Sequence, residues 1–294
     1  MKSKPKKRPQ RKLVVLSLFD GLGGARIALD RLGIPCEYYA SEVDKNCIKV
    51  SSARFPDIVQ LGDVRKIKGT EIPPVDLLIG GTPCTDVSNL NLTGKGLEGE
   101  QSGLFFEYVR LKDLLDPTYF LMENVRCPAA YEMSRHVGVD PASINSDRFV
   151  PQNRQRNYWS NLMFATLPPR PRWGLRFVQC DHSGEYFKSF LGGTSPTVTT
   201  HNRGYNIWFQ YVGGNEHWPV SRTRLDPPAY RKDCNLPEWL RFPDADLCEM
   251  LQGLPPGYTI VSGVSERERM KMIGNGFTIP VIQHLLSPLT AIFS

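Results

Sequence analysis

The sequence predicts an α/β fold with a doubly wound, mostly parallel sheet, and two observations support this prediction. From residue 13 onward, short apolar runs alternate with amphipathic stretches that are long enough to form helices. The apolar runs end in glycine or an acidic residue, as VDLLIGG does at residues 75–81. Strands separated by helices form parallel sheets, which bind their ligands at the carboxyl ends of the strands. Functional residues are therefore expected directly after the strands.

The expected elements alternate as this fold requires. Strands are expected within residues 13–21, 37–44, 58–67, 75–81 and 119–125. Helices are expected within residues 25–34, in the polar stretch after residue 44, and within residues 104–115.

The later part of the chain has a different character. After about residue 160 proline and glycine become frequent, and no long periodic helix is expected before Val264. We predict a basic disordered tail at 1–12, a main domain at 13–164, a smaller loop-rich region at 165–242 and a C-terminal segment at 243–294. That last segment is expected to be helical on both sides of a Gly-Asn-Gly turn and to pack back onto the main domain.

Composition narrows the class of protein. The chain has 294 residues, a net charge of +6 and seven cysteines without a C-x-x-C pair, which argues against a disulfide framework and against a metal site. The sequence shows no secretory signal and no apolar run near the roughly 18 residues of a membrane span. We therefore expect an intracellular protein that contacts no membrane.

The N-terminal tail is strongly basic. Seven of its residues are cationic: Lys2, Lys4, Lys6, Lys7, Arg8, Arg11 and Lys12. Such a tail can contact phosphate, act as a nuclear-import signal or only increase solubility. The expected compartment is the nucleus in a eukaryotic host and the cytoplasm in a bacterial or viral setting.

Three consecutive strand ends carry residues typical of a nucleoside site. Phe19-Asp20-Gly21-Leu22-Gly23-Gly24 opens the first helix, where glycines allow close backbone approach and free N–H groups face a ligand. Glu42 ends the second strand, where related folds place a carboxylate on ribose hydroxyls. Asp63 ends the third strand and can accept from an exocyclic amine. Each acid could instead cap a helix. Together they favour S-adenosylmethionine over NAD.

The next two strand ends carry candidate catalytic groups. Cys84 follows Gly80-Gly81-Thr82-Pro83, just past the fourth strand, where a structural cysteine is less expected than a nucleophile. Glu123 ends the fifth strand, and a carboxyl in such a half-buried position can donate a proton; a strand-end salt bridge is the alternative. Arg154 and Arg156 would point to one side of an extended segment and could bind a carboxylate and a base oxygen.

These motifs together resemble the DNA cytosine-5 methyltransferases. FDGLGG, GGTPC, ENV, QNRQR and GNGFTIPVI occur in the order and approximate spacing of that family. Segments such as SLFDGLGGARIALDRLGI, GDVR and GLFFEYVRL look most like the catalytic domain of the animal de novo enzymes. The resemblance implies a class I, Rossmann-like methyltransferase fold, with residues 13–164 as the catalytic and cofactor-binding domain and 165–242 as the target-recognition region.

The resemblance also implies a mechanism and assigns residues to it. The target cytosine would be flipped out of duplex DNA, Cys84 would attack its C6 atom, Glu123 would bind its N3 edge, and Arg154 and Arg156 would hold its O2 edge and fix Glu123. S-adenosylmethionine would be the cofactor. Its predicted contacts are Phe19, Asp20, Gly21, Leu22, Gly24, Glu42, Val43, Asp63, Val64, Pro83, Leu104, Asn275 and Phe277.

Contacts with DNA and with a second subunit are predicted with less support from the motifs. His201, Asn202, Arg203 and Tyr205 are the expected groove contacts. The family's apolar dimer face matches the Phe105 and Phe106 segment, which predicts a possible homodimer.

The chain also departs from the animal enzymes. Arg269 matches an arginine of their polar self-association face, but Ile260 replaces its aspartate partner, and Glu266 replaces a phosphate-contacting arginine. Two other functions stay open at this point: a tRNA cytosine-5 methyltransferase, whose Cys-Phe-Thr signature is absent from the recognition region, and a catalytically silent partner of a methyltransferase.

Overall fold

The structure is a computed structural model, and it describes residues 11–83, 103–171, 173, 175–180, 186–191, 206–211 and 244–293. The chain divides into two compact units. The first comprises Met1–Ile144, Gln155–Thr166 and Ile279–Ser294, and the second comprises Asn145–Arg154 and Leu167–Thr278. The predicted domain boundaries at residues 164 and 242 differ from this division, which assigns residues 145–154 and 243–278 to the second unit.

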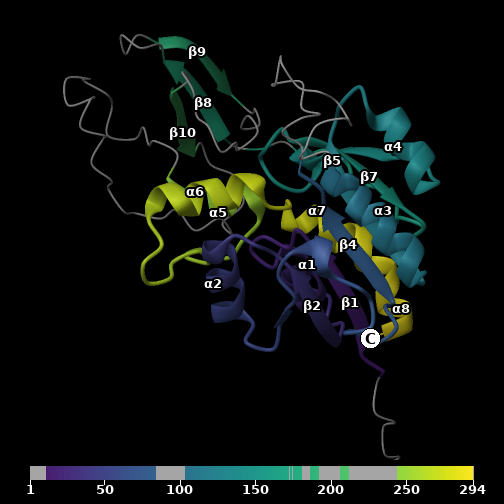
Figure 1. The fold of residues 1–294 in the computed structure, drawn as a ribbon. Helices are drawn as coiled ribbons and strands as arrows, with labels where there is room; N and C mark the ends of the chain where they lie inside the picture. The colour runs from purple at the N-terminus through teal and green to yellow at the C-terminus, as the bar shows by residue number, and fades with distance from the viewer. Residues whose placement is uncertain are drawn as a thin grey trace, which may run out of the picture. The chain divides into compact units, whose positions relative to one another are not determined.

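Figure 1 labels most of the strands and helices. The strands are β1 (Leu13–Leu18), β2 (Cys36–Ser41), β3 (Val59–Gln60), β4 (Leu77–Gly81), β5 (Tyr119–Val125), β6 (Ala142–Asn145), β7 (Gln155–Ser160), β8 (Leu175–Cys180), β9 (Tyr186–Leu191) and β10 (Asn206–Tyr211). The α-helices are α1 (Gly24–Arg31), α2 (Lys45–Arg54), α3 (Gly103–Leu115), α4 (Ala130–Val137), α5 (Ala245–Gln252), α6 (Glu266–Asn275), α7 (Ile279–Leu286) and α8 (Thr290–Phe293). Short 3₁₀ helices are η1 (Val64–Lys66), η3 (Ser146–Arg148) and η5 (Ser287–Leu289).

The first unit contains a sheet with the strand order β3-β2-β1-β4-β5-β7-β6. Strands β1 to β5 pair in parallel, and β7 runs antiparallel to β5. The predicted doubly wound, mostly parallel fold is confirmed. The chain builds outward from β1 through β2 and β3, then returns to place β4 on the other side of β1. Ligands of such sheets bind at the carboxyl ends of the strands at this switch point.

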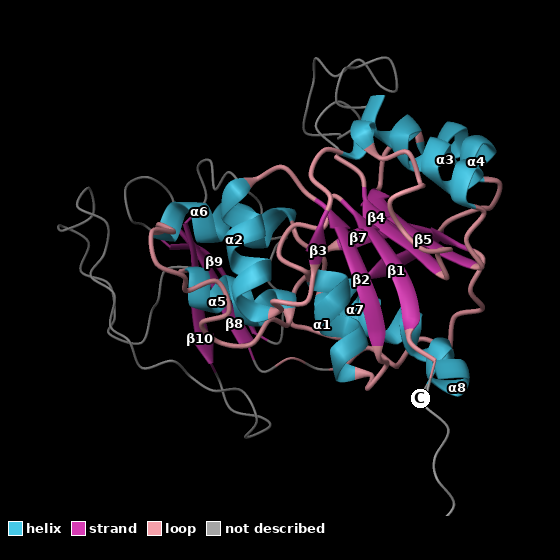
Figure 2. Cartoon of the chain, turned by 60° about the horizontal axis from the view of Figure 1, so that its bottom comes forward, coloured by secondary structure: helices cyan, strands magenta, loops and turns pink. Residues whose placement is uncertain are grey.

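Both faces of the sheet are covered. Leu16 and Leu18 of β1 belong to one core cluster with Tyr108 of α3 and side chains of α4. Because side chains alternate along a strand, Val15 and Ser17 point to the opposite face, and they are fully buried as well. α1 packs against α7, and Figure 2 shows these two helices beside each other and apart from α3 and α4. A strand that is buried on both faces explains the continuous apolar run LVVLSL.

The C-terminal helices include one apolar stretch. Glu266–Phe293 is long and apolar enough, by length and composition alone, to cross a membrane. Within it, however, α6 ends at Asn275 and α7 begins at Ile279, and a core helix passes the same test of composition. The apolar side of α7 is buried as in a core helix, through Ile279, Val281, Ile282, Leu285 and Leu286. The predicted absence of a membrane contact stays a prediction.

The second unit has more regular structure than we predicted. The region expected to be loop-rich contains β8, β9 and β10, which form an antiparallel sheet in the order β10-β8-β9. α5 precedes Val264, where no helix was expected, and it packs against α6. α5 has only eight residues, and Asp244 caps it by accepting a hydrogen bond from the Leu247 amide, so this helix is too short for a clear periodic pattern.

Arg269 of α6 stabilises the second unit from within. Its guanidinium lies 2.6 Å from Asp246, 3.1 Å from Glu249 and 3.0 Å from Glu266, and only 8% of the residue is exposed. Buried cations need such partners. This arginine matches the self-association arginine of the animal enzymes, but here its charge is compensated inside the unit, so it does not form a polar surface for a second copy.

Gly80 of β4 lies where a side chain has no room. A Cβ atom at this position would lie 3.0 Å from the Leu18 carbonyl oxygen and 3.2 Å from the Tyr108 ring. We expect Gly80→Ala to lower the free energy of unfolding by about 1–3 kcal/mol, because the packed strand and helix must move apart. Urea unfolding followed by circular dichroism measures this change.

Gly103→Ala is the matched control for this substitution. Apart from its chain neighbours and the backbone of its own helix, no atom of the described residues lies within 4 Å of a Cβ built at Gly103. Equal free energies of unfolding for the two variants would contradict the close packing around Gly80.

Candidate active site

The turn after β1 has an unusual backbone. Phe19 has a φ of 55°, and Gly21 and Gly23 have φ of 59° and 75°. Positive φ is easy for glycine but rare for a bulky residue such as Phe19. Gly23 is the N-cap of α1 and no side chain caps this helix, so its first amides point out of the turn. Strained residues of this kind cluster at ligand sites.

Glu42 joins the end of β2 to this turn. Its Oε2 accepts a hydrogen bond from the Gly21 amide at 2.8 Å, while Oε1 accepts from the Val43 and Asp44 amides, each at 2.8 Å. Asp44, rather than Glu42, caps α2. The structure therefore brings together the first two strand ends that we predicted for the cofactor, and the helix-cap alternative does not apply to Glu42.

Asp20 is a buried acid with one oxygen that lacks a partner. The residue is 4% exposed, and its Oδ1 accepts a hydrogen bond of 2.6 Å from the Tyr38 hydroxyl. Its Oδ2 has no hydrogen-bond partner among the described residues. Burial raises the pKa of Asp20 from 3.8 to about 6, although the neighbouring Tyr38 and Ser17 hydroxyls oppose the shift. A buried, unsatisfied acceptor at a strand end is suited to a cationic or hydrogen-bond-donating ligand.

Asp63 lies three residues beyond β3 and caps η1. Its Oδ1 accepts from the Arg65 amide at 3.1 Å, and the Arg65 guanidinium grips both carboxylate oxygens at 2.6–3.1 Å. The hydrogen bonds from Arg65 lower the pKa of Asp63 to about 2. The helix-cap alternative thus holds for Asp63, whose carboxyl group is ionised at neutral pH. Val64 beside it is buried, whereas Val43 is 68% exposed and offers an apolar surface.

The end of β4 lies next to Glu123 of β5. Gly81 pairs with Glu123 in the parallel register, and Cys84 follows Gly81 by three residues. Asn124 is 1% exposed and donates to the Thr82 side chain at 2.7 Å and to the Thr82 carbonyl at 3.3 Å. Asn124 therefore fixes the turn that leads to Cys84. Asn124 was not among the predicted site residues, although it directly follows Glu123 in the sequence.

Glu123 forms an ion pair with Arg156. The Arg156 Nε atom lies 3.1 Å from Glu123 Oε1, and the two side chains are 14% and 13% exposed. In the antiparallel register Arg156 lies opposite Val125, so it meets Glu123 diagonally on the same face of the sheet. The structure brings this predicted pair together, and the strand-end salt bridge weighed as the alternative role of Glu123 is present.

Arg154 has other partners in the second unit. Its guanidinium donates to the carbonyl oxygens of Gly274 at 3.2 Å and Gly276 at 3.1 Å, and the residue is 5% exposed. Carbonyls at the end of a helix lack internal partners, and Arg154 satisfies those at the end of α6. It thereby joins QNRQR to the turn that contains Asn275, which is exposed, and Phe277, which is half-buried. These three predicted site residues belong to the second unit.

The sequence matches a known protein family. Residues 13–129 match the family described as C-5 cytosine-specific DNA methylase. The Type II methyltransferase M.DsaV of Dactylococcopsis salina is 32% identical over an alignment of 306 positions, which covers 93% of this chain and 85% of that protein. The chain belongs to the C-5 cytosine-specific DNA methylase family.

Other members of the family are longer than the part that aligns with this chain. The orphan methyltransferase M.SPRI of Bacillus phage SPR is 33% identical over 186 residues, which cover 58% of this chain but 42% of that protein. The chain thus spans less than half of this relative. These relatives come from a bacterium and a phage, so the closer likeness to animal de novo enzymes stays a prediction.

Solved structures agree on the fold. The S. pombe Dnmt2 methyltransferase superposes with a TM-score of 0.64 at 15% identity, covering 96% of this chain and 99% of that one. The Entamoeba histolytica methyltransferase EhMeth gives a TM-score of 0.66 at 14% identity, covering 97% and 100%. At such low identity the likeness concerns the fold alone.

Several predicted residues cannot be placed in this methylase. Cys84, His201, Asn202, Arg203 and Tyr205 lie outside the described residues. Pro83 and Leu104 are described and flank the segment that contains Cys84, and Leu104 packs against the core cluster. Within the described ranges no group of three or more His, Cys, Asp or Glu side chains could hold a metal ion.

The predicted dimer face needs one correction. Phe105 is 1% exposed and belongs to the core cluster, so it cannot contact a second subunit. Phe106 is 39% exposed, and its ring meets that of His136 edge-on at 5.1 Å. The segment can therefore contribute only Phe106 to such a face, and the dimer itself stays a prediction.

The raised pKa of Asp20 makes stability depend on pH. The unfolded carboxyl titrates near 3.8 and the folded one near 6, so its contribution is full below about pH 4 and declines as pH rises through 6. Relative to Asp20→Asn, the wild type should lose up to about 3 kcal/mol between pH 4 and 7. Urea unfolding at several pH values measures the difference.

Asp57→Asn provides the control for the Asp20 experiment. Against the raising effect of its burial, the hydrogen bond and charge of Arg26 lower the pKa of Asp57. Its difference from the wild type should therefore stay constant above about pH 4. A flat difference for Asp20→Asn over the same range would contradict the burial of an ionisable Asp20.

Proposed function

We propose that this chain is a DNA cytosine-5 methyltransferase that methylates C5 of a cytosine in duplex DNA with S-adenosylmethionine as cofactor. The observation that carries the proposal is the Glu123–Arg156 pair, which lies beside the strand end that leads to Cys84. Membership of the methylase family gives this pair its chemical meaning. Activity on DNA, rather than on RNA, rests on the same membership.

The cofactor side of the site fits S-adenosylmethionine. Its ammonium and sulfonium groups are cationic, and Asp20 offers a buried oxygen that has no partner among the described residues. After accepting three amides, Glu42 retains one lone-pair site, on Oε2, for a ribose hydroxyl. Exposed Val43 can cover an adenine face, and Asp63 and Val64 can meet its edge. We assign Phe19, Gly21, Leu22 and Gly24 to the turn around it, and Pro83, Leu104, Asn275 and Phe277 to its remaining contacts.

The chemistry follows from the roles we assign to the chain's own residues. The cytosine must leave the base stack, because its C5 and C6 atoms cannot be reached within the duplex. The Cys84 thiolate adds to C6, and Glu123 hydrogen-bonds the N3 edge and the amino group, so that electron density accumulates at C5. When bound, S-adenosylmethionine supplies the electrophilic methyl group that C5 takes up. Loss of the C5 proton to a water-relayed base then expels the thiolate from C6 and restores the ring.

Arg156 orients Glu123 in this scheme. Its forked guanidinium holds the carboxylate and leaves donors for the O2 atom of the base. We assign the same edge of the base to Arg154, and groove contacts to His201, Asn202, Arg203 and Tyr205. De novo specificity, an intracellular location and a dimer through Phe106 complete the proposal.

Methyl transfer into nucleic acid tests the proposal directly. The wild type is incubated with labelled S-adenosylmethionine and either mixed-sequence duplex DNA or tRNA, and the product is mapped by methylation sequencing. We expect label in duplex DNA only, and no label with Cys84→Ser, because a hydroxyl is a far poorer nucleophile than a thiolate at neutral pH. Label in tRNA, or label in neither substrate, would overturn the proposed substrate.

Arg156→Gln should reduce the chemical step and spare cofactor binding. The substitution leaves Glu123 without its cation, and we expect kcat to fall by about 10²-fold or more, as when an oriented electrostatic partner is lost. The affinity for S-adenosylhomocysteine, measured by calorimetry, should stay within about twofold, or about 0.4 kcal/mol, because Arg156 is assigned to the base and not to the cofactor.

Arg135→Gln is the control for loss of charge. Arg135 is exposed in the last turn of α4, and its replacement should leave kcat unchanged. A normal kcat for Arg156→Gln would exclude the assigned role of Arg156.

A further inference from the structure

The loop between β3 and the next strand contains Asp63 and Val64, and its two halves are fixed differently. Residues of β2 hold the first half: the Leu61 amide donates to the Ala40 carbonyl at 2.7 Å, and the Ser41 hydroxyl donates to the Gly62 carbonyl at 2.7 Å. The second half, Val64 to Ile67, forms η1 and its end. Within this turn the Ile67 amide donates to the Val64 carbonyl at 3.2 Å, and the Val64 and Ile67 oxygens can each accept a further hydrogen bond.

Arg110 of α3 binds these carbonyls. Its Nη1 donates to the Ile67 oxygen at 3.1 Å, and its Nη2 donates to the Val64 oxygen at 3.2 Å. Its Nε donates to Glu107 one turn earlier at 2.8 Å, which orients the guanidinium. The planar fork of arginine makes these contacts at once, whereas the point charge of lysine cannot. The Arg110 and Glu107 side chains are 38% and 24% exposed.

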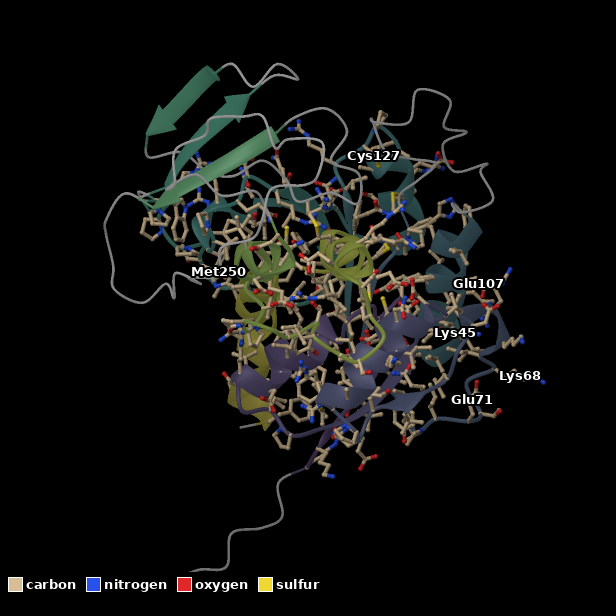
Figure 3. All side chains as sticks on the ribbon, turned by 90° about the vertical axis from the view of Figure 1, so that its left-hand side faces the viewer. Lys45, Lys68, Glu71, Glu107, Cys127 and Met250 are labelled. Atoms are coloured by element: carbon tan, nitrogen blue, oxygen red, sulfur yellow. The ribbon has the colours of Figure 1, made fainter. Side chains whose placement is uncertain are left out.

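Figure 3 supports this placement. The labelled Glu107 side chain lies on the same side of the molecule as those of Lys68 and Glu71, which come after η1 in the same loop. The Lys68 amide donates to Glu71 at 2.9 Å, so the chain beyond Ile67 turns locally and does not replace Arg110 at these carbonyls. In the part of the chain that the structure describes, no other side chain is recorded as a donor to the Val64 or Ile67 oxygen.

The helix that carries Arg110 also begins at the end of the segment that contains Cys84. α3 starts at Gly103, followed by Leu104, and Tyr108 packs in the core against β1 and β4. The position of α3 is therefore set by the sheet. Through its hydrogen bonds to the Val64 and Ile67 carbonyls, Arg110 links this helix to the loop that contains Asp63.

We propose that Arg110 is a positioning residue for the adenine end of the cofactor site, a role that rests on the proposed function. By holding the Val64 and Ile67 carbonyls, it fixes the backbone that presents Val64 and the Asp63 carboxylate. Without it the loop must be ordered when the cofactor binds, which weakens binding. Chemistry at the cytosine does not involve Arg110, so the turnover of the saturated enzyme is unaffected.

Arg110→Gln tests this proposal. We expect KM for S-adenosylmethionine and Kd for S-adenosylhomocysteine to rise about tenfold, the size expected for hydrogen bonds from a charged group. Arg110→Lys should give a smaller rise, and kcat should stay within about twofold in both variants, a change well below that expected for a lost catalytic contact. Calorimetry and steady-state methyl transfer measure these quantities on the full chain.

Two control variants separate positioning from stability. Glu107→Gln removes the negative charge but keeps an amide oxygen that can accept from the Arg110 Nε atom, so the guanidinium stays oriented on both carbonyls and Kd should match that of the wild type. Arg26→Gln removes an arginine with ion pairs to Asp30 and Asp57; it should lower Tm without changing Kd.

Each outcome of this experiment has a defined meaning. An unchanged Kd for Arg110→Gln, a loss in kcat alone, or an equal rise in Kd for Glu107→Gln or Arg26→Gln would overturn the positioning role. A wild type that binds no S-adenosylhomocysteine would overturn the proposed function itself, and this inference with it.

Discussion

The parallel register of β1, β4 and β5 is the constraint on which the candidate site depends. It pairs Leu18 with Gly80 and Gly81 with Glu123, so the glycine turn after β1, the turn before Cys84 and the Glu123 carboxylate all emerge at one edge of the sheet. Gly80 permits this register because any side chain would meet β1 and α3. A shift by one residue would turn every side chain of a strand to the other face, and the site would be lost together with the core.

Most of the parallel sheet could be predicted because strands buried on both faces are continuous apolar runs bounded by turns. The antiparallel strand β7 was missed because its sequence, QRNYWS, alternates in burial only partly and lies among polar residues. β3 has two residues and carries almost no pattern. The antiparallel sheet of the second unit lies in the region with scattered aromatic and proline residues, where the period-two pattern is hidden by loop residues.

The sequence indicates which types of residue the candidate site contains, but not which atoms those residues contact. Arg154 and Arg156 were expected on one side of an extended segment, but β7 begins at Gln155, so the period-two rule does not extend to Arg154. Arg154 instead donates hydrogen bonds to the carbonyl oxygens at the end of α6. Asp20 and Asp63 show the same limit, because burial raises the pKa of Asp20 and the hydrogen bonds from Arg65 lower the pKa of Asp63. Asp20 contacts Tyr38 and Asp63 contacts Arg65, and no sequence pattern specifies the distances between these side chains.

One kind of contact recurs between segments that are distant in the sequence. A polar side chain of one segment satisfies backbone or hydroxyl groups of another: Glu42 binds the Gly21 amide, Asn124 binds Thr82, Arg110 binds the Val64 and Ile67 carbonyls, and Arg154 binds those of Gly274 and Gly276. Loops that carry functional groups have backbone atoms without helix or sheet partners, and burying them unpaired is costly. The side chains that meet this need also fix the loops in place. In such a site the groups that react and the groups that hold them are separate residues, so a complete set of reactive side chains does not by itself make the loops hold their geometry.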